Sequence, residues 1–402
     1  MERWHVLTAG AVTSLVGFAS SAMVVIAGLS AVGASPAQAA SGLAALCVVQ
    51  GICTIAMSHR YRMPVLVVWS TPGAALLAGT GAATGDWPAS VGAFIATGLL
   101  VLLTGLWPRL GALIAAIPTS IAQAMLAGVL LELCLAPVHG VIDHPGLLLP
   151  PTLVWLVLLR LAPRWSVPAG FAAAIATIGI WVQGHGGLHG DLLPSLEPVA
   201  PHFSASALLT IALPLYVVTM ASQNVPGVAV LASFGYDVPW RPSMLATGAG
   251  TVAGAFAGGH AVNLAAITAA LAAAPEAHPD PRQRYRVAAA AGWFFLLIAL
   301  ASAAITTVVS TAPAGVAVGV AGLALIGTLA SAMTGAMAEP TERVAAAVTF
   351  VVAASDVTVA GIGAAFWALL AGLVVHLTLA RRAPRAPQAE PAPTGPAART
   401  AG

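Results

Sequence analysis

The sequence predicts an all-α polytopic membrane protein in which fourteen transmembrane segments form a 7+7 inverted repeat. Composition predicts the class, because 59% of the 402 residues are hydrophobic and only 7% are charged, whereas soluble domains carry about 25% charged residues. The positions of arginine predict an even number of spans. Polar and proline positions that recur in the same order in both halves of the chain predict the repeat.

Hydropathy and helix-breaking residues divide the chain into apolar segments. In order, they cover residues 6–32, 38–57, 65–83, 90–106, 110–133, 147–161, 167–182, 205–231, 243–256, 257–274, 287–309, 314–333, 344–354 and 357–380. Residues 184–204 are polar and rich in Gly and Pro, so we expect a periplasmic linker there. Residues 383–402 are a Pro/Ala/Arg tail that cannot bury a core, so we expect a disordered cytoplasmic tail.

The charges test this division. With the N-terminus in the cytoplasm and alternating segments, all fifteen arginines fall on the inner side, and there is no lysine. The charged residues of the outer loops are all acidic, namely Asp86, Glu132, Asp143, Asp191, Glu197 and Asp356. This pattern follows the positive-inside rule. It predicts a multi-pass protein of the bacterial-type inner membrane with both termini in the cytoplasm.

Similar polar residues and prolines recur in the two halves of the chain. Ser20 and Ser21 lie in the first segment, and Ser222 and Gln223 lie in the eighth, each pair followed by a proline at a similar distance. Interruptions by small or polar residues occur in the third and tenth segments. Seven segments per half is an odd number, so the second half must be inserted upside down. Inverted repeats of this kind are typical of secondary transporters, with the substrate site near the membrane midplane.

The third and tenth segments are each predicted to be a short strand followed by a half-helix. Residues 65–69 are apolar and mostly β-branched, and Ser70, Thr71 and Pro72 then supply helix-start residues. The tenth segment starts at Gly258, and its apolar helix lasts roughly ten residues, about half of the ~20 needed to cross a bilayer. Broken helices at membrane depth survive only inside protein or beside a cavity.

We expect both half-helix starts to meet at the midplane. Each helix N-terminus carries about +0.5 charge, so two starts offer about one positive charge to a carboxylate without a buried arginine. His260 is an ionisable candidate for substrate or proton handling. Each candidate also has a plain structural interpretation, such as helix packing or bonding to backbone freed by proline. The predicted substrate-binding residues are Gln223, Asn224, His260, Asn263, Gly259, Ser70, Thr71, Ser20 and Ser21.

Several stretches of the sequence resemble the signature segments of BenE-type benzoate/proton symporters. The resemblance covers nearly the whole chain apart from the tail. It is carried by VTMASQNVPG at 218–227, WSTPGAAL at 69–76, AAITAA at 265–270, PEAHPD at 275–280, IP at 117–118, AG at 127–128 and GIGAAFW at 361–367. It implies the 7+7 fold shared with uracil/xanthine permeases and sulfate-type permeases.

The same resemblance implies a core domain of residues 1–106 and 205–309 and a gate domain of residues 107–183 and 310–382, often in a homodimer. It also implies uptake of benzoate or a similar aromatic carboxylate with protons. Uracil permeases use acidic residues in the eighth and tenth spans, which this sequence lacks. The proton therefore travels either on His260 or with the substrate as a neutral acid.

Two other functions compete with aromatic-acid import. The first is a carrier of the same fold, or an uncoupled conductor, for another small organic or inorganic anion. The second is a membrane-embedded enzyme, which the sequence disfavours because no clustered carboxylates or histidines occur within the segments. We expect no cofactor, no metal site and no nucleic-acid partner. The expected partners are a small aromatic carboxylate, protons and membrane lipid.

Overall fold

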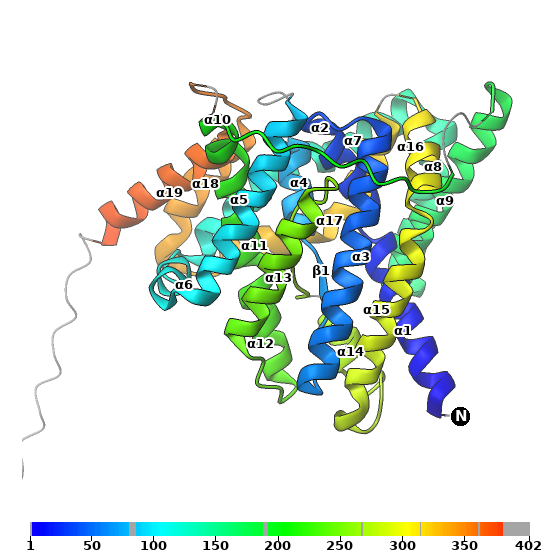
Figure 1. The fold of residues 1–402 in the computed structure, drawn as a ribbon. Coiled ribbons are helices and arrows are strands. Elements are labelled where there is room, and N and C mark those ends of the chain that lie inside the picture. The colour runs from blue at the N-terminus through cyan, green and yellow to red at the C-terminus, as the bar shows by residue number, and fades with distance from the viewer. Residues whose placement is uncertain are drawn as a thin grey trace, which may run out of the picture.

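The computed structural model describes residues 2–79, 86–187, 192–266, 268–313, 315–360 and 362–380. Over these residues the chain is almost entirely helical (Figure 1). Seven described helices are long and apolar enough to cross a membrane, or eight if the bent pair Pro281–Ala299 and Ser302–Thr311 counts as one span. The predicted tail at 383–402 and the outer residue Asp191 lie outside the described residues.

The described residues of the first half form nine helices and one strand. They are α1 (Glu2–Ala19), α2 (Ala22–Ala31), α3 (Pro36–Tyr61), β1 (Val67–Trp69), α4 (Thr71–Gly79), α5 (Trp87–Leu106), α6 (Pro108–Ala115), α7 (Thr119–Asp143), α8 (Pro145–Leu161) and α9 (Pro163–Gly184). The predicted third segment is therefore a strand followed by a nine-residue helix.

The second half contains the other strand and several short helical turns. Its elements are α10 (Ala205–Ala207), the π-helical turn η1 (Leu208–Ala212), α11 (Leu213–Thr219), the π-helical turn η2 (Met220–Asn224), α12 (Val225–Ser233), α13 (Trp240–Ala255), β2 (Val262–Leu264), α14 (Ala269–Ala273), the 3₁₀ turn η3 (Pro281–Gln283), α15 (Arg284–Ala299), α16 (Ser302–Thr311), α17 (Val316–Ala336), the 3₁₀ turn η4 (Pro340–Glu342), α18 (Arg343–Ala354) and α19 (Ala364–Ala380).

Several segments that the sequence predicts as continuous are interrupted. The first divides into α1 and α2 at Ser20 and Ser21, and the eleventh bends by 54° between α15 and α16. The eighth contains both π-helical turns, η1 shortly before Pro214 and η2 shortly before Pro226. Proline has no N–H to bond the carbonyl four residues earlier. A π-helical turn is a known way for a helix to absorb such a missing bond.

A small antiparallel sheet lies at the centre of the fold. Strands β1 and β2 pair Val67 with Leu264, Val68 with Asn263 and Trp69 with Val262. Two further backbone hydrogen bonds extend the pairing, from Ser70 N–H to Ala261 O at 2.8 Å and from Ala265 N–H to Leu66 O at 2.9 Å. A two-stranded sheet is marginal by itself, and each strand has an outer edge that needs partners.

Side chains from neighbouring helices bond these outer edges, and we call them the edge-closing side chains. On the β1 side, Ser58 of α3 donates to Val65 O at 3.0 Å, Thr54 bonds both the N–H and the C=O of Val67 at 2.9 and 3.0 Å, and Gln50 accepts from Trp69 N–H at 2.9 Å. These three side chains are spaced four residues apart, so they share one face of α3.

The β2 edge is closed in the same way from different helices. Thr251 of α13 accepts from Val262 N–H at 3.0 Å and donates to Val262 O at 3.4 Å, and Asn224 of η2 accepts from Leu264 N–H at 2.9 Å. In a membrane no water can satisfy such backbone groups. The edge-closing side chains therefore take the place of third and fourth strands.

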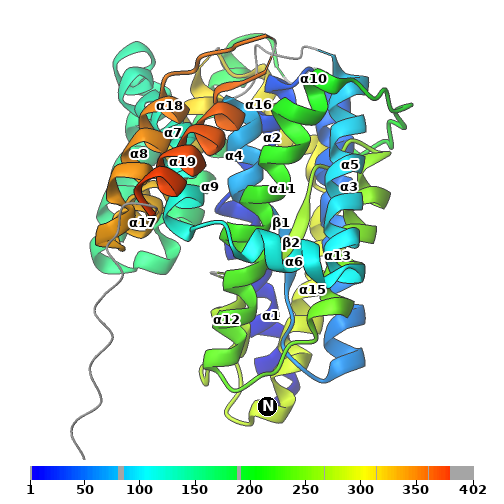
Figure 2. The same cartoon turned by 90° about the vertical axis from the view of Figure 1, so that its left-hand side faces the viewer.

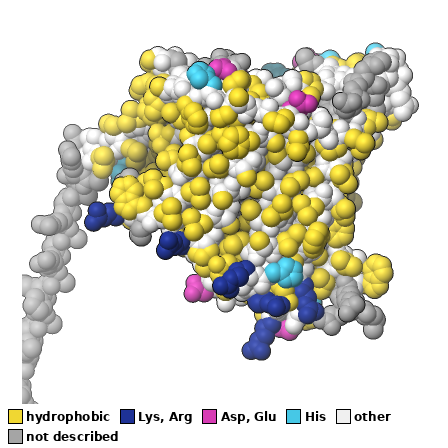
Figure 3. All heavy atoms as spheres, viewed as in Figure 1, with side chains coloured by type: hydrophobic (Ala, Val, Ile, Leu, Met, Phe, Trp, Pro, Cys, Tyr) yellow, Lys and Arg dark blue, Asp and Glu magenta, His cyan; other side chains and the backbone are white. Residues whose placement is uncertain are grey.

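The helices form two groups around this sheet. Figure 2 shows α3, α5 and α13 on one side, and α8, α17, α18 and α19 on the other. Within the first group α13 packs on both α5 and α3, and within the second α7 packs on α17 and α18. Figure 3 shows hydrophobic side chains covering the middle of one face and arginines only toward its lower part, where the N-terminus lies in Figure 1.

The contact between α5 and α13 depends on glycine. A Cβ added to Gly248 would lie 2.7 Å from the backbone nitrogen of Leu102, and one added to Gly98 would lie 2.9 Å from that of Val252. The two helix backbones therefore touch directly, as is common between membrane helices.

We predict that Gly248→Ala lowers the free energy of unfolding by about 1–3 kcal/mol, because the added methyl group overpacks this contact. Thermal unfolding of the detergent-solubilised protein, followed by circular dichroism, measures the effect. Gly179→Ala in α9 is the matched control, because a Cβ there meets nothing within 4 Å. Equal unfolding temperatures for Gly248→Ala and the control would contradict the close approach of α5 and α13.

Candidate functional site

A cavity of about 350 Å³ lies beside the sheet, where both broken segments change from strand to helix. Thr71 and Pro72, the first residues of α4, form one part of its wall. Thr268 and Leu271, at the start of α14, form another, and Trp69 at the end of β1 lies with them. The two strand-to-helix transitions therefore border the same cavity.

Helices from both groups enclose this cavity. Ser20 and Ser21 line it from the break between α1 and α2, and Gln50 lines it from α3. Across from these, Arg164 lines it from the first turn of α9 and Thr328 lines it from α17. Because its wall is shared between the groups, a movement of one group against the other would change the shape of the cavity.

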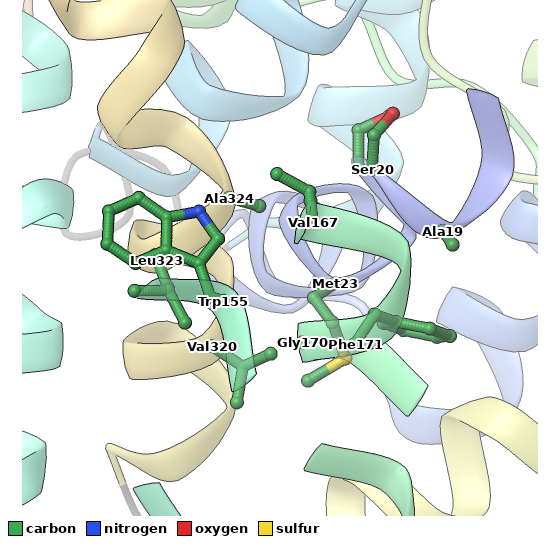
Figure 4. A pocket seen from close by; sticks show the side chains of 11 residues that line it. Ala19, Ser20, Met23, Trp155, Val167, Gly170, Phe171, Val320, Leu323 and Ala324 are labelled. Carbon is green, nitrogen blue, oxygen red and sulfur yellow. The ribbon is translucent and has the colours of Figure 1, made fainter. Parts of the chain in front are cut away.

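A much narrower pocket shares Ser20, Ser21 and two further wall residues with this cavity. It measures about 10 Å³, which is room for about one water molecule. Figure 4 shows Met23, Phe171 and Val320 of α2, α9 and α17 around this narrow part. Phe171 lies about two helical turns along α9 from Arg164, so the narrow part is on the side away from that arginine.

A second cavity, of about 530 Å³, lies at the other end of α4. Ala78 and Gly79 line it together with Glu132, His139 and Asp143. The body of α4 thus separates an acidic cavity from the one that Arg164 lines.

The start of α4 is fixed by hydrogen bonds behind the cavity wall. The Ser70 hydroxyl accepts from Gly73 N–H at 3.1 Å and caps the helix, and it also accepts from the Thr219 hydroxyl at 2.9 Å. Ser70 is fully buried and does not line the cavity, whereas its neighbour Thr71 does. The N-terminal end of α4, which carries partial positive charge, is thereby held against the cavity.

The tenth segment differs from its prediction. Its helix α14 begins at Ala269 and has five residues, whereas the sequence predicts a short strand followed by an apolar helix of roughly ten residues. Residues 262–264 are extended because they pair with β1, and the helix ends before Pro275. Arg284 bonds its last carbonyl, with Nη1 donating to Ala273 O at 2.7 Å. Since the macrodipole sums aligned peptide units, α14 contributes less positive charge than α4 does.

The adjacent amides Gln223 and Asn224 have different environments. Gln223 is half-buried and lines the cavity. Asn224 is fully buried, its Oδ1 accepts from Leu264 N–H, and its Nδ2 lies 3.2 Å from the Met220 sulfur. Asn224 is therefore an edge-closing side chain, and Gln223 is the amide available to a ligand.

The predicted position of His260 at a half-helix start is wrong. It precedes β2, is fully buried, and lies edge-on to Phe94 at 6.4 Å between ring centroids. Its Nδ1 accepts from Ala261 N–H at 2.7 Å. Gly259 lies beside it, where an added Cβ would be 3.1 Å from Gly254 O. Neither residue lines the cavity, because pairing of β2 with β1 directs this stretch into the packed interior.

Asn263 also lies inside the sheet. In the amide orientation that satisfies both of its polar atoms, its nitrogen donates to Leu264 O at 2.8 Å and its oxygen accepts from Ser70 N–H at 3.1 Å. The predicted residues that line the cavity are Gln223, Thr71, Ser20 and Ser21, and those packed behind it are Ser70, Asn224, Gly259, His260 and Asn263.

Aromatic side chains form part of the wall. The Trp69 indole N–H donates to the Ser21 hydroxyl at 2.8 Å, and Phe18 contacts the Trp69 ring edge-on at 5.6 Å between centroids. Phe295 of α15 lines the cavity as well. The Ser21 hydroxyl is thus committed to holding Trp69, and the cavity combines aromatic surface with a few polar groups.

Sequence reasoning missed four polar residues of the cavity, namely Gln50, Arg164, Thr268 and Thr328. The signal for Gln50 was the polar series Gln50, Thr54 and Ser58 on one face of an apolar helix. Arg164 was expected only as a loop charge, and nothing in the sequence shows that it reaches a cavity. No group of three or more His, Cys, Asp or Glu among the described residues is arranged to hold a metal ion.

A cavity enclosed by two groups of apolar helices beside broken membrane segments is the arrangement of a membrane transport protein rather than an enzyme. The chain matches the BenE family model, described as benzoate membrane transport protein, over residues 3–378. It therefore belongs to the BenE family, as the sequence resemblance predicted.

Two curated relatives cover most of the chain. Inner membrane protein YdcO of Escherichia coli is 40% identical over 378 residues, which are 93% of this chain and 95% of that protein. The benzoate membrane transport protein of Acinetobacter baylyi is 28% identical over 337 residues, 81% of this chain and 82% of that protein.

Solved structures show the same fold at low sequence identity. The transmembrane domain of the cyanobacterial bicarbonate transporter BicA aligns with a TM-score of 0.60 at 16% identity, covering 94% of this chain and 97% of that one. SLC26A9 aligns with a TM-score of 0.59 at 14% identity, covering 92% of this chain and 65% of that one.

We predict that Asn224→Ala lowers the free energy of unfolding by about 1–3 kcal/mol, because the Leu264 N–H is left buried without a partner. Gln223→Ala, which changes a cavity residue, is the matched control and should stay within about 0.5 kcal/mol of wild type. Thermal unfolding in detergent checks both. A larger loss for Gln223→Ala than for Asn224→Ala would show that the two amides have been assigned to the wrong roles.

Proposed function

We propose that this protein imports benzoate or a similar aromatic carboxylate together with protons, by alternating access across the inner membrane. The observation that carries the proposal is the cavity at the strand-to-helix transitions, with a helix start and amides beside aromatic and apolar walls. Its volume of about 350 Å³ is within the range of about 300–1,000 Å³ usual for small-molecule sites. Membership of the BenE family supports the choice of substrate.

The carboxylate binds at the N-terminal end of α4. Thr71 and the Gln223 amide line the cavity there, and the helix end carries about +0.5 charge. The five-residue α14 adds less, so the site differs from two equal helix starts that face each other. Arg164 is exposed where it lines the cavity. It draws the anion toward this mouth by its positive field.

The aromatic ring lies against the apolar part of the wall. Trp69, Phe295, Leu271, Val167 and Pro168 provide surfaces that a ring can contact edge-on or in offset stacking. These side chains offer nothing to a small inorganic anion, which needs donors all around it. The lining therefore favours an aromatic carboxylate over the alternative of another small anion.

We further propose that the chain crosses the membrane fourteen times as a 7+7 inverted repeat. Each strand of the sheet is followed by a helix, β1 by α4 and β2 by α14. Thr54 bonds the N–H and C=O of Val67 just as Thr251 bonds those of Val262. The middle residues of the strands pair with each other, which is the relation expected around a two-fold axis.

In this proposal residues 1–106 and 205–309 form the core domain, and residues 107–183 and 310–382 form the gate domain, with 184–204 as the periplasmic linker. The two helix groups in Figure 2 support this division.

The arginine-rich end faces the cytoplasm by the positive-inside rule, together with both termini. The cavity is lined by Arg164, and the 10 Å³ pocket lies away from that arginine, which supports an inward-open form. Assembly as a homodimer stays a prediction.

The carboxylate binds as the anion and then takes up a proton, so that substrate and proton cross the membrane together as the neutral acid. Among the described residues that line the cavity, Arg164 is the only ionisable one. His260 is separated from the cavity by the sheet and packs on Phe94. A neutral substrate needs no charged protein group to accompany it through the apolar path.

We predict that reconstituted protein catalyses counterflow of labelled benzoate and that an acid-outside pH gradient increases its accumulation. Protein-free vesicles correct for benzoic acid that crosses lipid by itself.

Gln223→Ala should weaken benzoate binding about tenfold or more, because a hydrogen bond to a charged group contributes about 1.5–3 kcal/mol. If the wild-type protein catalyses counterflow but the pH gradient has no effect, the protein is a carrier without proton coupling. If it catalyses no benzoate counterflow, benzoate is not its substrate.

We also predict that His260→Gln retains gradient-driven benzoate uptake, because His260 lies outside the cavity. Uptake by this variant is compared with wild type after both are matched for the amount of folded protein by size-exclusion chromatography. Counterflow that persists while the gradient effect disappears would instead identify His260 as the proton carrier.

A further inference from the structure

We propose that Gln50 binds the substrate carboxylate, with its side-chain Nε2 as the hydrogen-bond donor. This inference rests on the proposed function and adds a specificity-determining residue to the same site. It joins two observations, namely that Gln50 lines the cavity and that the nitrogen of its buried amide has no hydrogen-bond partner among the described residues.

The orientation of this amide is fixed by the sheet. Gln50 is 1% exposed, and its Oε1 accepts from Trp69 N–H at 2.9 Å. Rotating the amide by half a turn would place two donors against each other, so the oxygen must face the strand. The NH₂ group is therefore the part of the amide that remains for another partner.

A buried amide donor without a partner costs about 1–3 kcal/mol. The other edge-closing side chains on α3 do not carry this cost, because the hydroxyls of Thr54 and Ser58 donate to Val67 O and Val65 O. Asn224 has the same task as Gln50 on the β2 edge, and its nitrogen contacts the Met220 sulfur. Gln50 alone among these side chains combines a spare donor with a place on the cavity wall.

Gln50 shares the cavity wall with Thr71, the first residue of α4. Gln50 bonds Trp69, which is two residues before Thr71 at the start of α4. A carboxylate oxygen there would accept from the amide NH₂ while it also faces the helix end. Because the same amide holds the edge of β1, bound substrate and strand become parts of one hydrogen-bonded network.

The test compares three variants by benzoate affinity, measured by calorimetry on the purified full-length protein. Gln50→Met keeps the side-chain length but removes donor and acceptor. Thr54→Val is the matched control, because it removes the neighbouring edge contact at a residue that does not line the cavity. Gln50→Glu keeps an acceptor for Trp69 N–H and replaces the NH₂ by an ionisable group.

We expect Gln50→Met to bind benzoate about tenfold more weakly or worse, and Thr54→Val to bind within about twofold of wild type even if its unfolding temperature falls. Gln50→Glu should lose affinity relative to wild type as pH rises, because an ionised carboxylate repels the substrate. Arg164, the only other ionisable side chain among the described lining residues, stays charged throughout such a titration.

The outcomes separate this inference from the proposed function. If wild type binds benzoate and both Gln50 variants bind it equally well at all pH values, the donor role of Gln50 is refuted and the function stands. The role is also refuted if Thr54→Val weakens binding as much as Gln50→Met, because Gln50 then acts only by holding the strand. If wild type itself binds no benzoate, the proposed function falls and this inference falls with it.

Discussion

The structure depends on satisfying the backbone of a two-stranded sheet whose outer edges are buried among apolar helices. Strands β1 and β2 bond each other along one edge only. Their outer edges would leave N–H and C=O groups unpaired in an apolar interior, at a cost of several kcal/mol for each group. Polar side chains on α3, α13 and η2 remove that cost. The helices are thereby fixed in register with the sheet.

The two-stranded sheet also creates the cavity. A strand that ends in the middle of the protein must pass into a helix, and the transition leaves space beside Thr71 and Thr268. The π-helical turn η2 then places two adjacent amides differently, with Asn224 on the sheet edge and Gln223 on the cavity. Polar groups needed for folding and polar groups available to a ligand therefore come from the same few turns of the chain.

The local signals in the sequence were enough for much of the fold. The sequence was enough to predict the apolar segments, the break at Ser70 to Pro72 and the membership of the BenE family, because each depends on residues that are close together in the chain. A strand before the helix of the tenth segment was predicted, but the start of that helix at Ala269 was not. Gly258 and Gly259 are typical of a helix boundary, but pairing with β1, almost 200 residues away, keeps the following residues extended.

The same long-range pairing explains the errors in the site. It directs His260 toward Phe94 and Asn263 toward Ser70, although both had been expected at a helix start. Arg164 lines the cavity only because α9 packs against α1 and α17, which no local pattern encodes. Gln50 was visible as part of a polar series, but its meaning depends on the strand that it bonds.

The most direct measurement is an experimental structure of the protein with 4-iodobenzoate, in which the iodine atom shows which way the ring points. Our interpretation predicts the carboxylate next to the start of α4, within hydrogen-bonding distance of Gln50 and Gln223, and the iodine toward the apolar wall. A ligand bound outside this cavity, or bound with its carboxylate directed away from α4, would contradict it.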